Sequence, residues 1–169
     1  MRLYGHDDLP HLYSTVVENL DHLHTYLAWA TRDFKEESAA QFITRSRWEA
    51  DERKTLALGI FRNGTLAGSA GFASFAWHSK RAEIGYWIAK KFEGKGIITN
   101  ACRRLISHGF DELDLNRIEI RCAMENARSR AVPERLGFTL EGVIRQGEWR
   151  HTRYHDMAVY GLLRSEWNN

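Results

Sequence analysis

The chain has 169 residues, and its shares of hydrophobic (43%) and charged (27%) residues are those of an ordinary soluble globular protein. This length is enough for one domain with a sizeable core, so we expect a single domain over residues 1–169. No apolar run approaches the roughly 18 residues of a membrane span, and residues 1–8 lack the apolar core of a signal peptide. We therefore expect a cytoplasmic protein with no membrane contact, in which Cys102 and Cys122 are reduced structural thiols.

The formal net charge is only +2, but the charge is spread unevenly along the chain. Residues 1–79 carry 8 Lys and Arg against 10 Asp and Glu, whereas residues 80–169 carry 16 against 12. The basic excess in the second half suits a phosphorylated ligand, and it equally suits a solvated basic face. A pI of about 8.6 and the lack of a recognisable module argue against nucleic-acid binding, except through a ribosomal substrate.

The first half of the chain combines helical and strand patterns. Leucine and valine residues recur every three or four positions between residues 7 and 30, which predicts one continuous helix. Asn63 and Gly64 predict a hairpin turn, because both residues tolerate a positive φ. The elements expected before residue 81 are a short strand at 2–5, helices at 7–30 and 36–53, strands at 55–62 and 65–76, and a turn at 77–80.

A strand, a glycine loop and a helix follow one another between residues 83 and 113. Residues 83–89 alternate as a strand, Gly94 and Gly96 stand two apart in a charged loop, and apolar residues then recur at helical spacing. The first turn of a helix has free N–H groups and a positive dipole end, and glycines let the backbone approach phosphate oxygens closely. This order predicts a phosphate site, although an ordinary strand-to-helix turn shows the same short pattern.

The last third of the chain is expected to hold strands at 116–123, 138–148 and 153–163, with a short helix at 126–137. Asn126 is the predicted N-cap of that helix, and Gly137 is predicted to end it. One strand–helix–strand crossover among hairpins indicates an α/β domain of the mixed α+β kind, with a mostly antiparallel sheet. His151 and His155 lie on a turn and a strand without a suitably spaced third ligand, so we expect no metal site.

Together these residues resemble the GNAT superfamily of acetyl-CoA-dependent N-acetyltransferases, over nearly the whole chain. The loop at residues 91–96 reads KFEGKG and is similar to the superfamily's pyrophosphate-binding signature, Arg/Gln-x-x-Gly-x-Gly/Ala, with Lys in the first position. Within the superfamily the chain most resembles the RimJ/RimL branch, the ribosomal-protein N-terminal acetyltransferases and their small-molecule relatives. The residues that carry this are EIGYW at 83–87, NARS at 126–129, LGFTLEG at 136–142 and YHDM at 154–157.

The resemblance implies helices on both faces of the sheet, acetyl-CoA as cosubstrate and no metal. Backbone N–H groups of the glycine loop and the next helix turn would bind the pyrophosphate. The residues concerned are Gly94, Lys95, Gly96, Ile97 and Ile98. A backbone N–H within Trp87, Ile88 and Ala89 would donate to the thioester carbonyl oxygen. Asn126 would bond the pantetheine amides, close to Ser129.

The same resemblance implies two catalytic side chains. Ser129 matches the serine that protonates the departing thiolate, and Glu148 matches the carboxylate that acts as general base. Glu83 is the reserve base, because an acidic residue that opens an apolar strand near a cleft can have a raised pKa. The plainer alternatives are a polar helix-turn residue for Ser129 and a solvent-facing position for Glu148. For Glu83 the alternative is a salt bridge, for instance to Arg81 or Arg117.

The acceptor amine is left open by the sequence. The first expectation is the α-amino group of a protein or peptide N-terminus, which attacks directly in a ternary complex. The second is a small amine, such as an antibiotic, a polyamine or an aminoacyl-nucleotide toxin, and the third is an acetyl-CoA-binding regulator without turnover. Trp29, Trp48, Trp77 and Trp149 would either line an acceptor cleft or fill the core between the N-terminal helices and the sheet. A monomer and a homodimer both remain open.

Overall fold

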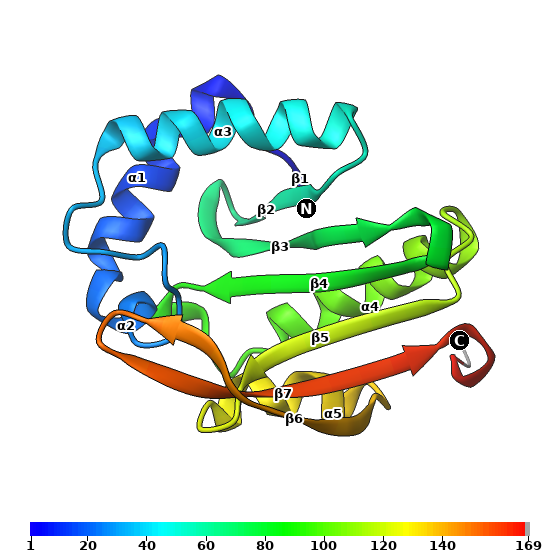
Figure 1. Ribbon diagram of the computed structural model, residues 1–169. Coiled ribbons are helices and arrows are strands. Elements are labelled where there is room, and N and C mark those ends of the chain that lie inside the picture. The colour runs from blue at the N-terminus through cyan, green and yellow to red at the C-terminus, as the bar shows by residue number, and fades with distance from the viewer. Residues whose placement is uncertain (168–169) are drawn as a thin grey trace.

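The computed structural model describes residues 1–167, and its fold is built on one seven-stranded sheet (Figure 1). The strand order is β1-β2-β3-β4-β5-β7-β6, and every neighbouring pair is antiparallel except β4–β5. The strands are β1 (Arg2–Leu3), β2 (Leu56–Arg62), β3 (Thr65–Ala76), β4 (Arg81–Ile88), β5 (Arg117–Ala123), β6 (Thr139–Arg150) and β7 (Arg153–Leu163). The helices are α1 (Leu9–Glu18), α2 (Leu20–His24), α3 (Glu36–Asp51), α4 (Ile97–Asp111) and α5 (Ala127–Arg135). The expected mixed α/β class with one parallel crossover is confirmed.

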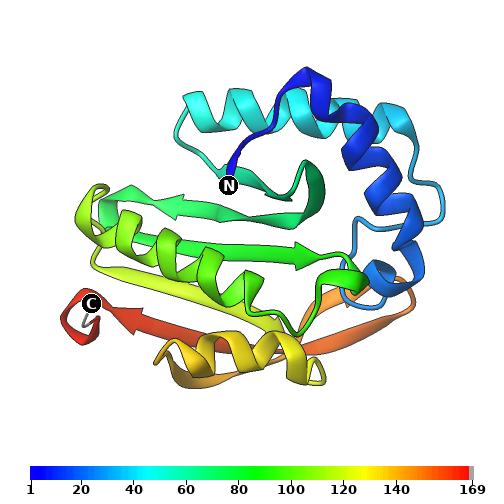
Figure 2. The ribbon, with the colours of Figure 1, turned by 180° about the vertical axis from the view of Figure 1, so that it is seen from behind.

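Two hydrophobic clusters anchor the helices to the sheet. The larger lies beneath α4, which crosses the middle of the sheet beside α5 on the face seen in Figure 2, and it includes Ile106, Phe110 and Ile118. The smaller, which includes Val16 and Ile43, joins α1 and α3 to the β1–β3 side. The residues of α4 that recur at helical spacing are the buried ones, so its apolar stripe explains where it packs. None of the helices within residues 1–167 is long and apolar enough to cross a membrane.

The continuous helix expected between residues 7 and 30 is wrong. Helix α1 ends at Glu18, Asn19 leaves helical geometry with φ −115° and ψ 15°, and α2 adds only five residues. The side chain of Asn19 causes the break, because its amide nitrogen donates to Thr15 O (2.8 Å) and its oxygen accepts the Lys90 N–H (2.9 Å). The bend therefore ties the α1–α2 junction to the loop that follows β4.

Strands β4 and β5 diverge before they end (Figure 1). Their parallel pairing covers Arg81–Ile84 against Arg117–Ile120, yet β4 continues to Ile88 and β5 to Ala123. Beyond Ile84, β4 keeps its pairing with β3, and β5 keeps its pairing with β7. The sheet therefore has a fork, and the glycine loop follows β4 just past the open end of that fork.

Candidate active site

The glycine loop has the backbone shape that the sequence predicts for a phosphate site. Gly94 and Gly96 both have φ +70°, in the left-handed region, and Gly96 is the N-cap of α4. A Cβ added to Gly94 would meet no atom within 4 Å, so the space in front of the loop is open. The first turn of α4 follows the loop directly, and the N–H groups of a first helix turn have no partner within the helix, which is the arrangement that binds phosphate.

Glu93 braces the loop from two sides. Its carboxylate accepts a hydrogen bond from Arg128 Nη1 on α5 (2.7 Å) and lies 3.4 Å from His22 Nε2 on α2. Lys95 Nζ also donates to the carbonyl oxygen of Lys91 (2.8 Å). The loop is thus held between α2 and α5, and its glycines are presented in a fixed position.

Ser129 lies across the fork from Tyr86, a residue that sequence reasoning did not single out. The Tyr86 hydroxyl donates to the Ser129 carbonyl oxygen (3.0 Å), and Ser129 Oγ donates to the Tyr86 hydroxyl oxygen (3.1 Å). The Ser129 N–H donates to Asn126 Oδ1 (3.1 Å), so Asn126 is the predicted N-cap of α5. A phenol that bonds a serine in the first turn of α5 could be found from the sequence only by knowing that β4 and α5 face each other.

The proton arrangement in this cluster follows from the donors. A carbonyl oxygen only accepts, so the single Tyr86 proton is used on Ser129 O, and Ser129 must point its own proton at Tyr86. Burial raises the pKa of Tyr86 far above its ordinary value, so the phenol stays neutral. Burial also raises the pKa of Cys122, beside Ser129, to about 11, so both neighbours are uncharged. Ser129 Oγ is therefore surrounded by neutral groups.

The backbone of β4 narrows the expected oxyanion donor to one residue. The Ala89 N–H donates to Ala67 O (2.8 Å), so it is not available to a ligand. Backbone groups alternate in direction along a strand, so Trp87 also faces β3, its register partner being Ser69. Ile88 faces the fork instead. Of Trp87, Ile88 and Ala89, only Ile88 has an N–H directed toward the open side of β4.

Glu148 is paired with a buried cation. Its carboxylate accepts a hydrogen bond from Arg150 Nη2, whose side chain is only 2% exposed, while Glu148 itself is 32% exposed. Arg150 Nη1 donates to Thr25 O (3.2 Å), in the segment that follows α2. The carboxylate is therefore neither fully solvent-facing nor free, since it balances the Arg150 charge where β6 meets the N-terminal part of the chain.

Glu83 lies at the closed end of the fork. It faces a cavity of about 310 Å³ that Ser74 and Glu119 also line, and its ion-pair partner is Arg121 (3.6 Å) rather than Arg81 or Arg117. Burial raises the pKa of Glu83, and Arg121 partly offsets this. Glu83 thus has both the raised pKa that was predicted and a salt bridge, which was the alternative.

Neighbouring Glu119 is the centre of an arginine cluster. Arg81, Arg117 and Arg121 donate hydrogen bonds to its carboxylate at 2.9–3.0 Å, and its side chain is 5% exposed. Burial alone would raise the pKa of Glu119, but these three donors outweigh it and hold the pKa at about 2. The cluster joins β4 to β5 where the two strands are still paired.

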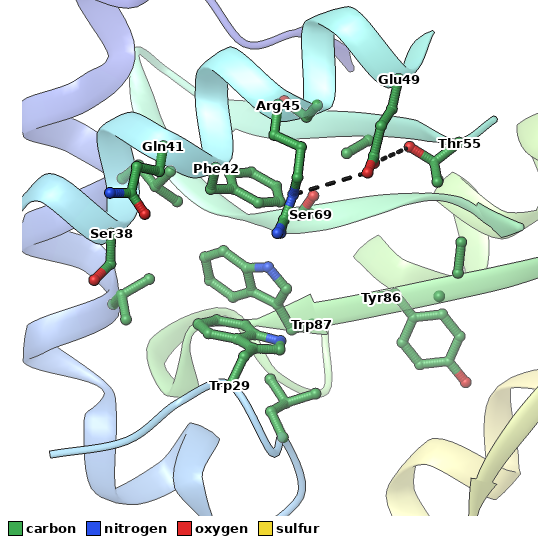
Figure 3. A pocket seen from close by; sticks show the side chains of 18 of the residues that line it. Trp29, Ser38, Gln41, Phe42, Arg45, Glu49, Thr55, Ser69, Tyr86 and Trp87 are labelled. Carbon is green, nitrogen blue, oxygen red and sulfur yellow. Dashed lines mark hydrogen bonds and ion pairs between the residues drawn. The ribbon is translucent and has the colours of Figure 1, made fainter. Parts of the chain in front are cut away.

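A larger cavity, of about 570 Å³, lies between α1, α3 and strands β2–β4 (Figure 3). Tyr86 and Trp87 of β4 line it, so it reaches the edge of the fork. Trp29 stands against Trp87 with ring centroids 6.1 Å apart and planes at 64°. Figure 3 shows Arg45 and Glu49 reaching down from α3, while Tyr86 points away toward α5. We call this cavity the side pocket.

Of the four tryptophans considered from the sequence, only Trp29 lines the side pocket. Trp48 and Trp149 are more than half exposed, and Trp77 stacks on Phe75 at the edge of the larger cluster. None of the four fills the core between the N-terminal helices and the sheet as the alternative expected, since none belongs to that cluster in residues 1–167 and only Trp77 packs against the larger one. Trp87, expected only near the thioester, forms the second aromatic wall.

His151 joins the β6–β7 turn to the segment after α2. Its Nε2 donates to His24 O (2.9 Å), and the two imidazoles stack with centroids 3.6 Å apart. His24 Nδ1 donates to Ala30 O (2.7 Å), next to Trp29. His155 instead bonds Glu125 (2.5 Å). No group of metal-ligating side chains occurs among the residues that the structure describes.

Comparison with known proteins shows to which family this fold and site belong. Residues 1–139 match the acetyltransferase (GNAT) domain family. YdaF of Bacillus subtilis (strain 168), provisionally named a ribosomal N-acetyltransferase, is 39% identical over 99% of this chain and 92% of its own length. RimL, a ribosomal L7/L12 α-N-protein acetyltransferase solved with coenzyme A, is 28% identical at a TM-score of 0.93, covering 98% of this chain and 93% of its own.

A second solved structure has a different named role. MccE, the microcin C7 self-immunity acetyltransferase, was solved in complex with acetyl-CoA and AMP. It is 30% identical at a TM-score of 0.92, over 95% of this chain and 89% of its own. The family match, the sheet with its single parallel pair and the glycine loop agree with one another. The chain belongs to the GNAT acetyltransferase family, in its RimJ/RimL-like branch, and is an acetyl-CoA-dependent N-acetyltransferase.

Proposed function

We propose that this enzyme acetylates the α-amino group of a protein or peptide N-terminus, by direct attack of the amine in a ternary complex. The observation that carries the proposal is the fork between β4 and β5, which has the glycine loop at its mouth and the Tyr86–Ser129 pair across it. The similarity to RimL and YdaF supports a ribosomal-protein type of acceptor.

The residues present fit acetyl-CoA. Gly94, Lys95 and Gly96, with Ile97 and Ile98 of α4, offer backbone N–H groups and open space to a pyrophosphate. On the unpaired side of β4, the Ile88 N–H is available to the thioester oxygen. Ile88 is one of the three residues, Trp87 to Ala89, among which this donor was expected. Asn126 would meet the pantetheine chain through its amide nitrogen, because its oxygen already caps Ser129.

Ser129 is proposed to protonate the departing thiolate. Bound acetyl-CoA supplies an acyl group that is activated by a thiolate leaving group. The Ser129 hydroxyl has to rotate away from Tyr86 toward the sulfur, because the Tyr86 proton is used on the Ser129 carbonyl oxygen. As the C–S bond breaks, Ser129 Oγ passes its proton to the sulfur and takes up the proton that the amine nitrogen loses on forming the amide, so the serine ends neutral. Tyr86 is proposed as a positioning residue, because it holds Ser129 from two sides without carrying charge itself.

Glu148 is proposed as the general base, with Glu83 as the alternative. An α-amino group has an ordinary pKa of about 7.7–8.0, so part of it is already neutral near pH 7.5 and a weak base suffices. The ion pair with Arg150 holds the Glu148 carboxylate in place, and its partial exposure leaves it accessible to an incoming amine. Glu83 has the raised pKa, but it lies where β4 and β5 are still paired.

Mass spectrometry of a panel of amines after incubation with acetyl-CoA tests the proposed acceptor. The panel pairs peptides that have a free α-amino group with the same peptides blocked at the N-terminus and carrying one lysine. It also contains spermidine and an aminoacyl nucleotide analogue. One acetyl group on the free α-amino peptides alone is the expected result. Binding of coenzyme A without acetylation of any amine would contradict the proposal and favour the regulator.

A small amine is the second candidate acceptor. It is favoured by the side pocket, whose aromatic walls Trp29 and Trp87 suit a compact planar group, and by the similarity to MccE. In the same panel, preferential acetylation of the nucleotide analogue over every peptide would establish it.

A further inference from the structure

The side pocket has the size and shape of a substrate site. Its volume of about 570 Å³ is in the ordinary range for small-ligand cavities. The sheet side is formed by small residues, Gly71, Ala73 and Gly85, which leave Trp87 as the projecting group. Phe34 and Phe42 add aromatic surface from the segment before α3 and from α3 itself. A flat or apolar group would therefore be covered by rings on more than one side.

The packing around Gly85 would accept a side chain, whereas the packing around Gly71 would not. A Cβ built on Gly85 would meet only the Cβ of Ala73, at 3.4 Å, which is an ordinary contact. Gly71 differs, because a Cβ there would lie 1.6 Å from Leu56 O and the neighbouring strand forbids it. The packing of the sheet thus explains Gly71 but does not require Gly85.

Three charged side chains line the pocket among the described residues, Asp33, Arg45 and Glu49. Glu49 is committed to its neighbours, since it accepts a hydrogen bond from Thr55 Oγ1 (2.9 Å) and pairs with Arg45. The Arg45–Glu49 distance of 3.8 Å is too long for a hydrogen bond, and Arg45 is 67% exposed. Figure 3 shows the guanidinium above Trp87. Arg45 can therefore receive an anion without losing a strong partner.

This set of charges does not suit a polyamine. Each ammonium group of a polyamine needs a carboxylate, but Glu49 is already engaged and Asp33 lies exposed at the rim. Arg45 would repel a second ammonium group in the pocket. An anionic group on the acceptor would instead gain a charge-assisted contact with a planar, fork-shaped donor.

We propose that the side pocket binds acceptor amines that carry a planar or apolar group beside the amine and an anionic group beyond it, which Arg45 receives. This inference rests on the proposed function, because it takes the side pocket as the acceptor site. The anion can be the phosphate of a small phosphorylated amine or the acidic side chain of a peptide, since both have the oxygen geometry that a guanidinium binds.

The test compares matched amines that differ only in charge. Tyramine is paired with O-phosphotyramine, and the amidated peptide Phe-Ala-Gln-Ala with Phe-Ala-Glu-Ala; spermidine is the polyamine. Thiol release gives kcat/KM for each, and calorimetry gives Kd on the enzyme loaded with coenzyme A. In the wild type we expect the anionic member of at least one pair to have a five- to tenfold higher kcat/KM, roughly the effect of one partly exposed charge contact. Spermidine should fall below tyramine.

Arg45→Gln should bring the ratio between the two members of the preferred pair close to one. Arg62→Gln is the matched control, because Arg62 is an exposed arginine at the end of β2, outside the pocket, and it should keep the wild-type ratio. A preference for phosphate alone identifies a small phosphorylated acceptor, and a preference for the acidic peptide alone identifies an acidic N-terminal segment.

Equal kcat/KM within both pairs, or spermidine as the best acceptor, would overturn the inference. The inference would also be overturned if Arg62→Gln and Arg45→Gln lowered the ratio of kcat/KM between the anionic and the neutral amine equally. If coenzyme A binds but no amine is acetylated, the proposed function fails on its own. The calorimetric comparison of O-phosphotyramine with tyramine, in wild type and Arg45→Gln, then still decides whether the pocket selects an anion.

Discussion

The two halves of the active site differ in the groups that form them: backbone N–H groups on the cofactor side and side chains on the acceptor side. The proposed cofactor half consists mainly of one continuous stretch, in which β4, the glycine loop and the start of α4 present backbone N–H groups, with Asn126 and Ser129 at the start of α5 beside it. The proposed acceptor half, the side pocket, is assembled from side chains of α1, α3, the segment before α3 and strands β2–β4, which lie far apart in the sequence. A backbone site tolerates sequence change as long as the glycines remain, whereas a side-chain pocket changes its preference with a single substitution. The enzyme can therefore keep its chemistry while its acceptor varies.

The largest effect is expected on the cofactor side, from Ser129→Ala. Loss of a general acid typically costs about 10²–10⁴-fold in rate, so kcat should fall by that order while the KM for acetyl-CoA changes little. Steady-state kinetics with saturating acceptor measure the split. An unchanged kcat with a raised KM would instead assign Ser129 to binding. Tyr86→Phe is the companion variant, and it should lower kcat by about tenfold, because it removes only the hydrogen bonds that orient Ser129.

The next effect concerns the loop that makes the cofactor half a backbone site. Gly96→Val forces a β-branched residue into φ +70°, so the N–H groups at the start of α4 move out of position. The Kd for coenzyme A should rise by about 10- to 100-fold, the equivalent of one or two charge-assisted hydrogen bonds. Gly137→Val is the control, since Gly137 has φ +81° at the end of α5 and no atom within 4 Å of an added Cβ. Equal Kd values for the two variants in calorimetry would remove the loop from the site.

The pH profiles of two variants distinguish the two candidate bases, Glu148 and Glu83. Glu148→Gln should lower kcat/KM for the amine by about tenfold to a hundredfold near neutral pH. Activity should partly recover at alkaline pH, because an amine that is deprotonated in solution needs no base. Glu83→Gln should leave the profile close to wild type and lower only the melting temperature, since it removes one of the two carboxylates that pair with Arg121. The opposite pair of profiles would move the base to Glu83.

A smaller effect tests the acceptor half. Gly85→Ala adds one methyl group to the pocket wall at an ordinary contact distance from Ala73. The KM for an aromatic amine should rise by a few-fold to about tenfold, with no change in the Kd for coenzyme A. Gly142→Ala on β6, where an added Cβ meets nothing within 4 Å, serves as the control and should leave both constants at wild-type values.

The smallest expected effect is on the pH dependence of stability, through Glu119, which belongs to neither the cofactor half nor the acceptor half of the site. The pKa of Glu119 in the folded protein is about 2, below its ordinary value of 4.5, so its contribution is complete above pH 4.5 and is lost as the pH falls toward 2. Thermal melts between pH 6 and pH 3 should show a drop of a few degrees that is smaller in Glu119→Gln, whose melting temperature starts lower. An identical pH dependence in both proteins would show that the arginine cluster does not hold the fork closed at this end.

The difference between backbone groups from one stretch and side chains from distant stretches also explains what the sequence could predict. The glycine loop, the Asn126 cap and most strands are local patterns, and the structure has them as expected. Tyr86 was not identified, because its role depends on α5 lying across the fork. The break at Asn19 depends on Lys90, a residue 71 positions away, so periodicity alone predicted a continuous helix. The acceptor walls Trp29 and Trp87 likewise meet only through tertiary packing.

The contact between His24 and His151 has a consequence for the order of folding. The two residues are 127 positions apart, and their stacked rings hold the segment that carries Ala30 and Trp29. A ribosome makes the glycine loop and α4 well before the β6–β7 turn. Contacts between distant positions also close late, because a long chain segment must first lose its freedom. We therefore expect refolding to restore coenzyme A binding first and discrimination among acceptors afterwards, so that a newly made enzyme is competent to hold its donor before it can choose its target.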